Sequence, residues 1–278
     1  MPRFALVSAI LLGFASSLIA QPKPAQLPPG EKDAKGAVEK SPRHGEYADI
    51  KVEGRETPVK AYVVYPEVKE KAPVVIVIHE IFGLSDWIKS VTDQLAADGF
   101  IAIAPDLLSG KAPGGGGTEE LTKSGGDIRK TVQSITPEEA TKALDAIREY
   151  GMKLPASNGK TATIGFCWGG ARSFDYATKQ PGLSAAVVYY GTSPSDDALK
   201  NVTAPVLGHY GSDDARVNKT IEPAQAAMKA AGKTYIPHIY EGAGHGFLRQ
   251  QDGKDGANLK AAQQAWPETV KFIREHAK

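Results

Sequence analysis

The sequence predicts an α/β domain with a mainly parallel central sheet and helices on both of its faces. Short apolar runs rich in valine and isoleucine alternate with segments of helical period along most of the chain, which is the pattern of repeated βαβ units. Several of these runs are apolar at nearly every position, as expected for strands buried on both faces. The length of 278 residues suits one domain of this class or two small ones.

The expected elements follow one another from residue 46 onward. In the first expected helix, Trp87, Val91 and Leu95 are four residues apart and share one face. Thr136, Pro137 and Glu139 signal a helix start, as N-cap, first-turn proline and capping-box glutamate. The expected strands are 46–52, 59–66, 72–80, 100–106, 161–166, 183–191, 204–211 and 233–242. The expected helices are 86–100, 136–151, 169–180, 221–232 and 266–278.

The N-terminus has the layout of a cleaved signal peptide over residues 1–20. Arg3 precedes an apolar segment that starts at Phe4, and small residues lead to Ala20. A membrane anchor is the alternative, but the segment from Phe4 to Ala20 is short for a spanning helix and is interrupted by serines. We therefore expect export to the periplasm or the extracellular space, with no stable membrane anchor after cleavage.

Residues 21–45 differ in composition from both the predicted signal peptide and the predicted domain. Five prolines stand among charged residues between positions 21 and 45. This composition predicts a proline-rich flexible linker over residues 21–45. Residues 46–278 remain as the folded domain.

The composition excludes several classes of function. The formal net charge is +1 and we find no basic stripe, which argues against nucleic-acid binding. No G-x-x-x-x-G-K-[ST] loop is present, and the HEIFG stretch lacks the second histidine of H-E-x-x-H. The sequence therefore predicts neither a cofactor nor a metal.

Cys167 is the only cysteine in the chain, and it stands in the stretch GFCWGG. This stretch follows an expected strand and opens an expected helix, so it fits Gly-x-nucleophile-x-Gly with cysteine in the place of the usual serine. The N-terminus of a helix favours a thiolate, which is the nucleophilic form of cysteine. The alternative is a buried structural cysteine beside a glycine-rich bend.

A nucleophile in such an elbow needs an acid and then a histidine later in the chain. Of the six histidines, His245 alone stands in a glycine-rich loop just past an expected strand, in the stretch EGAGHGFL. Asp213 and Asp214 follow the strand over 204–211 and precede that histidine. Either aspartate could instead cap a turn. The order of the three features favours a catalytic triad with one of the two aspartates.

Five motifs stand at or near the ends of the expected strands: VIHEIFGL (77–84), APDLL (104–108), GFCWGG (165–170), GSDDARV (211–217) and GAGHGFLR (242–249). Through these motifs the chain resembles, from residue 45 to residue 278, the dienelactone hydrolase family of the α/β-hydrolase fold. The resemblance implies that Cys167 is the nucleophile and His245 the base. It also favours Asp214 over Asp213 as the acid, because Asp214 matches the family's G-x-x-D-x-x-V pattern.

The resemblance implies further roles around the triad. Glu80 matches a glutamate that engages the resting cysteine, and the backbone N–H groups of Ile81 and Trp168 match the oxyanion hole. Arg249 matches an arginine that holds the substrate carboxylate. One departure concerns a second such arginine, whose position is occupied by Gly110 with Lys111 next to it. Lysine supplies charge without a bidentate fork, so the departure bears on the substrate and not on the hydrolase chemistry.

We therefore expect an exported monomer that cleaves a small ester or lactone, of the dienelactone type and carrying a carboxylate, through a thioester on Cys167. A general carboxylesterase with a different substrate is the first alternative. A non-catalytic binding protein on a hydrolase scaffold is the second, and the complete triad argues against it. A thiol redox protein is disfavoured because Cys167 has no resolving partner in the chain.

Overall fold

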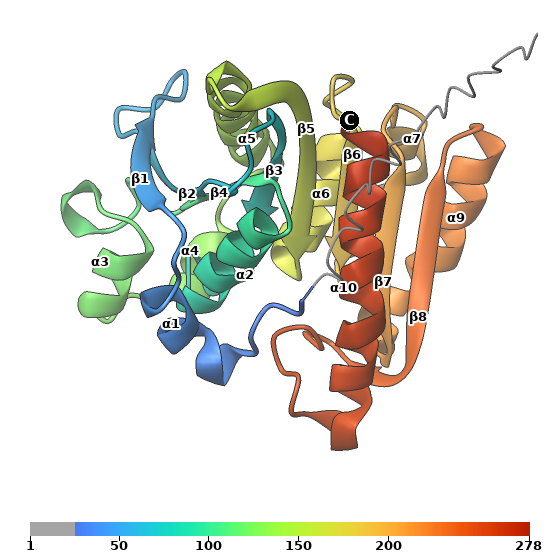
Figure 1. Cartoon of the computed structure of the whole chain (residues 1–278). Helices are drawn as coiled ribbons and strands as arrows, with labels where there is room; N and C mark the ends of the chain where they lie inside the picture. Colours follow the sequence, from blue (N-terminus) through green and yellow to red (C-terminus); the bar gives the residue numbers. More distant parts are fainter. Residues whose placement is uncertain (1–25) are drawn as a thin grey trace, which may run out of the picture.

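The computed structural model describes residues 26–278, which form an eight-stranded sheet flanked by helices (Figure 1). The strand order is β1-β2-β4-β3-β5-β6-β7-β8. β1 pairs with β2 and β2 with β4 in antiparallel fashion, and every other pairing is parallel. The strands are β1 (Gly45–Ile50), β2 (Val59–Val64), β3 (Ala72–Ile78), β4 (Ile101–Pro105), β5 (Ser157–Phe166), β6 (Ala185–Tyr189), β7 (Val206–Asp213) and β8 (Tyr235–Gly244). The predicted mainly parallel sheet is confirmed.

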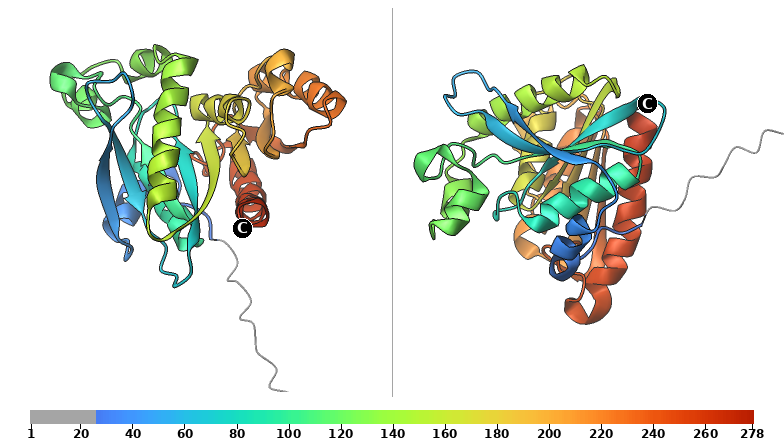
Figure 2. Two further views of the ribbon diagram at one scale, coloured as in Figure 1. Left: turned by 90° about the horizontal axis from the view of Figure 1, so that it is seen from above. Right: turned by 60° about the vertical axis from the view of Figure 1, so that its left-hand side comes forward.

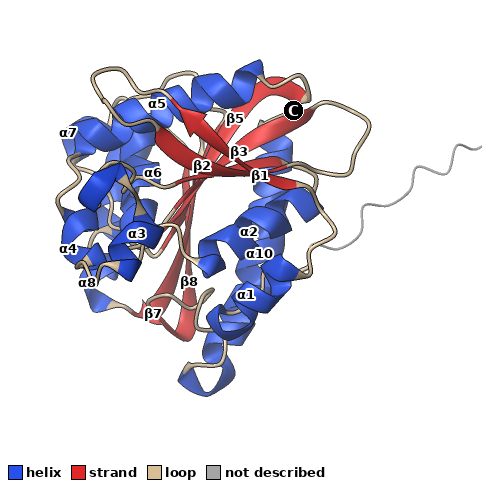
Figure 3. Ribbon diagram, turned by 90° about the vertical axis from the view of Figure 1, so that its left-hand side faces the viewer, coloured by secondary structure: helices blue, strands red, loops and turns tan. Residues whose placement is uncertain are grey.

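Helices cover both faces of this sheet, as Figure 3 shows in side view. They are α1 (Glu31–Glu39), α2 (Asp86–Ala97), α3 (Thr118–Lys123), α4 (Ile128–Gln133), α5 (Pro137–Lys153), α6 (Trp168–Ala177), α7 (Asp196–Leu199), α8 (Ala215–Asn218), α9 (Ile221–Ala230) and α10 (Ala257–His276). α1, α2 and α10 share one core and lie on one face, and α5, α6 and α9 share the other core on the opposite face.

The continuous apolar run of β3 explains why two layers of helices form. Successive side chains of a strand point to opposite faces, and here Val74 and Ile76 join the core under α5 and α6. Val75 and Val77 join the second core, under α2 and α10. All four side chains are fully buried. β3 therefore lies at the centre of the molecule, and its carboxyl end opens onto the same edge as that of β5.

Residues 26–45 are folded onto the domain, in place of the flexible linker that the prolines predicted. α1 packs against α2, and Ala34 of α1 is buried in the core shared with α2 and α10. The backbone N–H of Glu31 donates to the Arg249 carbonyl at 2.9 Å, and Gln251 donates to the Pro28 carbonyl at 2.9 Å. Composition alone could not reveal these contacts, because they join segments far apart in the chain, and the two hydrogen bonds join residues more than 200 positions apart.

The predicted signal peptide, residues 1–20, lies outside the described residues, as does the start of the predicted linker. Within residues 26–278, none of the helices combines the length and the apolar character needed to cross a membrane.

Two further regions differ from the sequence-based expectation. α10 begins at Ala257, well before the expected start at residue 266, and continues through Pro267. The buried side chains of Ala261, Ala262 and Ala265 fix this first half of the helix against the core. Between β4 and α5, the chain leaves the sheet and forms the short helices α3 and α4 (green in Figure 2), which no periodic pattern in the sequence predicted.

Candidate active site

Cys167 occupies a strained turn between β5 and α6. Its φ of 55° and ψ of −114° lie where non-glycine residues are uncommon. A Cβ atom on Gly165 would come within 2.0 Å of the Gly169 carbonyl oxygen, and one on Gly169 within 2.2 Å of the Ile78 carbonyl oxygen. Glycine is therefore required on both sides. The Cys167 N–H donates to the Tyr189 carbonyl at 3.0 Å, which ties the elbow to β6.

His245 and Asp214 lie side by side at the carboxyl ends of β8 and β7. His245 Nδ1 is 2.5 Å from Asp214 Oδ2. Asp214 is buried and is also the N-cap of α8, where its other oxygen accepts from the Val217 N–H at 3.4 Å. Asp213 is exposed and pairs with Lys254 instead. The geometry thus distinguishes the two aspartates that the sequence left open.

The surroundings of His245 favour its protonated form. Burial alone would lower its pKa, but the bonds and charges of Asp214 and Cys167 outweigh burial and raise the pKa to about 9. Burial would likewise raise the pKa of Asp214, yet the hydrogen bond to His245 and its charge hold that pKa below its usual value. Asp214 therefore stays ionised and orients the imidazole, which also interacts with Cys167.

Glu80 is buried just past the end of β3 and lies beside Arg249. The Nε atom of Arg249 is 2.7 Å from Glu80 Oε2. Burial raises the pKa of Glu80 to about 7, against the opposing charges of Arg249 and His245. Arg249 also forms an ion pair with Glu31 of α1 and lies over the Phe82 ring at 4.9 Å. Arg249 is thus held by two carboxylates, and a substrate carboxylate would have to compete with them.

The two predicted oxyanion-hole donors, Ile81 and Trp168, line the same cavity as Cys167 and His245. Trp168 is the first residue of α6, so its N–H has no partner within the helix. Among residues 26–278, the Ile81 N–H donates to no backbone carbonyl. Both N–H groups are therefore available to a ligand. Behind them, the buried His79 stacks on the Trp168 ring at 5.6 Å and lies 2.7 Å from the Glu80 carbonyl oxygen.

The cavity has a volume of about 520 Å³, which is within the usual range for small-molecule sites. Sequence reasoning missed Arg172, Arg216, Gln133 and Thr192 in its wall. The signal for the two arginines was their position, five residues after Cys167 and two after Asp214. Lys111 does not line this cavity, and its ammonium lies 3.2 Å from Glu139.

Tyr190 is a second residue that sequence reasoning missed. Its φ of 40° is positive, its ring lies 5.1 Å from that of His245, and its buried hydroxyl has no hydrogen-bond partner among the described residues. Burial raises its pKa, and the nearby charges that act on this pKa come from Glu80, Arg249 and Cys167. The tyrosine thus sits between the triad and the Glu80–Arg249 pair.

His209 lies apart from the cavity of Cys167 and belongs to the core. His209 is buried between the Tyr240 hydroxyl at 2.8 Å and the Thr269 hydroxyl at 3.0 Å, as a packed core histidine. Residues 26–278 hold no group of three or more His, Cys, Asp or Glu side chains arranged to bind a metal ion.

Comparison with known proteins places the chain in a family. The model of the dienelactone hydrolase family matches residues 59–277. Carboxymethylenebutenolidase of Pseudomonas putida is 32% identical over 183 residues, which cover 65% of this chain and 77% of that protein. A Methylorubrum extorquens protein, named as a proposed carboxymethylenebutenolidase, is 28% identical over 286 residues, covering 99% of this chain and 92% of that one.

Solved structures agree with this placement. The crystal structure of a proposed dienelactone hydrolase from Klebsiella pneumoniae superposes with a TM-score of 0.71 at 27% identity, covering 84% of this chain and 99% of that one. Acylaminoacyl peptidase of Pyrococcus horikoshii shares the fold at 14% identity, with a TM-score of 0.64, over 85% of this chain and 42% of the peptidase. The chain acts as a hydrolase of ester or lactone bonds, and it belongs to the dienelactone hydrolase family.

Proposed function

We propose that this hydrolase works through a Cys167–His245–Asp214 triad and a thioester intermediate. The observation that carries the proposal is the pairing of His245 with Asp214 at 2.5 Å, beside a cavity that Cys167 enters from a strained elbow. A strained, glycine-flanked turn persists where the surrounding structure holds it for function. A buried structural cysteine would need neither the charged histidine nor the cavity.

The first half of the reaction forms the thioester. The Cys167 sulfur adds to the substrate carbonyl carbon, and the oxygen that becomes negative accepts hydrogen bonds from the Ile81 and Trp168 N–H groups. Removing one such donor from a related site costs roughly 3–4 kcal/mol of transition-state stabilisation. The carbon–oxygen bond to the leaving group then breaks, and the imidazolium of His245 supplies the proton that the leaving oxygen takes.

The second half of the reaction releases the acid. His245, now neutral and oriented by Asp214, removes a proton from water, and the hydroxide adds to the thioester carbonyl. The carbon–sulfur bond breaks and the thiolate returns. Because a thiolate leaves easily, the first tetrahedral intermediate reverts unless the other leaving group is also good. The chemistry therefore favours enol esters, lactones and aryl esters over amides.

Glu80 is proposed as the partner of the resting cysteine. Its pKa of about 7 lets it hold or release a proton near neutral pH, and its ion pair with Arg249 holds it in place.

We also propose that the protein is exported, and this proposal rests on the sequence of residues 1–20 alone. Mass spectrometry of the mature N-terminus would test cleavage after Ala20. Cell fractionation would test whether the protein is recovered outside the cytoplasm.

A carboxylesterase with a substrate other than a dienelactone is the second candidate. It is supported by the occupation of Arg249 by Glu80 and Glu31 and by Gly110 at the position of the second family arginine. A panel of a dienelactone and aryl esters of rising chain length separates the two. The first candidate requires the highest kcat/KM on the lactone.

The proposed triad is tested by hydrolysis of para-nitrophenyl acetate by the wild-type protein, Cys167→Ala and His245→Gln. We expect turnover by the wild type, none by Cys167→Ala, and an acyl adduct on Cys167 that accumulates in His245→Gln and is seen in the intact mass. Turnover by Cys167→Ala at the wild-type rate would show that Cys167 is not the nucleophile.

A further inference from the structure

We propose that Arg172 and Arg216 form a carboxylate-binding subsite in the cavity of Cys167, which selects esters whose acyl group carries a second carboxylate. This inference rests on the proposed function and names the substrate class of the same site. Arg172 lies on α6, the helix that the nucleophile opens, and Arg216 lies on α8, the helix that Asp214 caps. The elements that carry the triad residues thus also place both arginines beside them.

The cavity is positively charged and contains no opposing acid in its wall. Its lining residues are Ile81, Gln133, Cys167, Trp168, Ala171, Arg172, Thr192, Arg216 and His245. Two of these are arginines, none is Asp or Glu, and His245 favours its protonated form. Such a wall attracts an anionic substrate, and a guanidinium binds a carboxylate through two parallel hydrogen bonds.

Arg172 keeps a buried donor free although its side chain is oriented by its neighbours. Its Nε atom is buried and has no hydrogen-bond partner among the described residues. A buried donor without a partner is uncommon in folded proteins. Its guanidinium lies over the Trp168 ring at 5.8 Å, which restricts its orientation.

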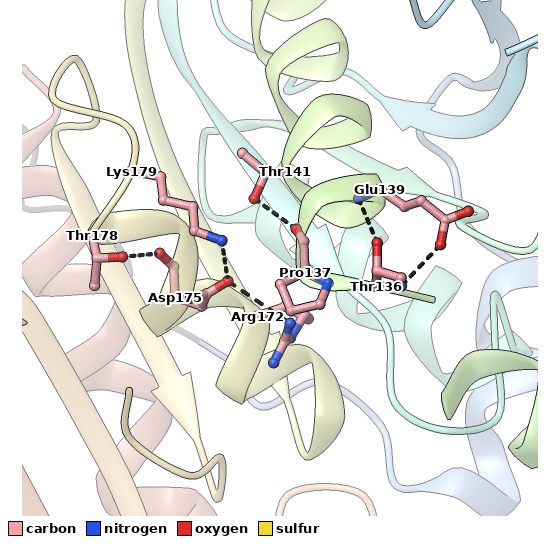
Figure 4. Close-up of polar contacts among 8 residues, drawn as sticks. All are labelled: Thr136, Pro137, Glu139, Thr141, Arg172, Asp175, Thr178 and Lys179. Carbon is pink, nitrogen blue, oxygen red and sulfur yellow. Dashed lines mark hydrogen bonds and ion pairs between the residues drawn. The ribbon is translucent and has the colours of Figure 1, made fainter. Parts of the chain in front are cut away.

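The nearest carboxylate to Arg172, that of Asp175, is a poor partner for it. Asp175 lies 3.8 Å from Arg172 Nη1 but 3.0 Å from Lys179 Nζ, and Figure 4 shows its carboxylate between the two cations. Arg172 therefore has hydrogen-bonding capacity left for a ligand in the cavity.

Arg216, on α8, is the second arginine of the subsite. It is exposed at the cavity wall, two residues past Asp214. Arg249 contrasts with both arginines, because Glu80 and Glu31 already hold it and it does not line this cavity. The positive charge that a substrate meets beside Cys167 is therefore that of Arg172 and Arg216.

The test compares two esters of equal length, mono-para-nitrophenyl glutarate and para-nitrophenyl valerate, which differ in a terminal carboxylate. We expect the wild type to prefer the glutarate ester in kcat/KM. Arg172→Met and Arg216→Gln should each reduce kcat/KM for the glutarate ester about tenfold, the usual size of a lost charged hydrogen bond, and leave the valerate ester unchanged. Lys219→Gln, which removes an exposed positive charge outside the cavity, is the matched control.

Two further readouts separate a binding role from a structural one. Added salt should lower kcat/KM of the wild type for the glutarate ester, because screening weakens charge attraction, and should have little effect on the double variant. Glutarate binding to Cys167→Ala, measured by calorimetry, needs no turnover and should be lost when Arg172→Met is added.

The outcomes distinguish the subsite from the triad. An unchanged glutarate-to-valerate ratio in the double variant, or an equal loss on both esters, overturns the subsite while the triad stands. Failure of the wild type to cleave either ester overturns the proposed function on these substrates. In that case glutarate binding that depends on Arg172 still supports the subsite, and the absence of such binding overturns it.

Discussion

The Arg249 guanidinium lies 2.7 Å from the buried carboxylate of Glu80 and also pairs with Glu31 of the N-terminal helix. This ion pair links the end of β3, where Ile81, the proposed oxyanion-hole residue, follows Glu80, to the loop that carries His245. It also links the active site to α1.

Glu80→Gln should make Cys167 more sensitive to oxidation. The substitution keeps the shape of the side chain but removes the carboxyl group that we propose as the partner of the resting thiol, whose pKa of about 7 lets it gain or lose a proton near neutral pH. We expect the rate of thiol loss in dilute peroxide to rise several-fold, measured by labelling of the remaining thiol. Glu31→Gln removes the other carboxylate on Arg249 and is the control, which should oxidise at the wild-type rate. An unchanged rate in Glu80→Gln would contradict a protective role.

Asp214→Asn should lower kcat/KM for an aryl ester by about 10³-fold or more, because the imidazole loses the group that orients it and stabilises its charge. Asp213→Asn should change kcat/KM less than about threefold, since Asp213 is exposed and pairs with Lys254. The two variants differ by one position in the chain, so they are closely matched. Equal losses in both would argue against Asp214 as the acid.

The stability contributed by His245 should depend on pH in a defined window. Its pKa rises from 6.5 in the unfolded chain to about 9 in the folded one, so the folded state binds the proton more tightly. The contribution is therefore fully present below about pH 6.5 and is lost as pH rises through about 9. Urea unfolding of the wild type and His245→Gln should show a stability difference that shrinks over this window. The same comparison in an Asp214→Asn background should show a weaker pH dependence.

Ala34→Asp should detach α1 from the domain. Ala34 is 1% exposed, and burying an unpaired carboxylate there costs more than the helix gains by docking. Hydrogen–deuterium exchange over residues 31–39 should speed up strongly, while Ala37→Asp, at an exposed position of the same helix, leaves it slow. Rapid exchange of this helix in the wild type would mean that residues 26–45 behave as the predicted linker after all.

Gly169→Ala should disrupt the elbow. The new Cβ would lie 2.2 Å from the Ile78 carbonyl oxygen and 2.4 Å from that of His79, so backbone must move. We expect loss of esterase activity and a decrease of more than about 2 kcal/mol in the free energy of unfolding. Gly36→Ala meets nothing within 4 Å in α1 and should be neutral or stabilising by up to about 1 kcal/mol. Wild-type activity in Gly169→Ala would contradict the geometry of the turn.

Much of this architecture follows from local sequence patterns. β3 and β4 are buried on both faces. Their sequences are therefore apolar at nearly every position, which is the pattern that predicted central strands. The elbow at Cys167 was predictable because a Cβ atom on Gly165 or Gly169 would clash with the backbone, so the turn needs glycine at both positions. Thr136 and Glu139 do form the expected capping box of α5, with hydrogen bonds of 3.1 Å and 2.9 Å.

Other features depend on contacts between distant residues, which local patterns do not reveal. The docking of α1 needs the loop around Arg249, which lies at the other end of the chain. Arg172 and Arg216 stand close to Cys167 and Asp214 in the sequence, but only the fold shows that both reach one cavity wall. Tyr190 owes its place beside His245 to a positive φ, and nothing in the residues next to it predicts that conformation.

The thioester mechanism is best tested by pre-steady-state hydrolysis of excess para-nitrophenyl acetate by the wild type, Cys167→Ala and His245→Gln, with intact-mass detection of the acyl-enzyme. We expect a burst of para-nitrophenol followed by steady turnover in the wild type, an acyl group trapped on Cys167 in His245→Gln, and neither in Cys167→Ala. Turnover in Cys167→Ala equal to that of the wild type, with no acyl adduct in any variant, would contradict the thioester mechanism.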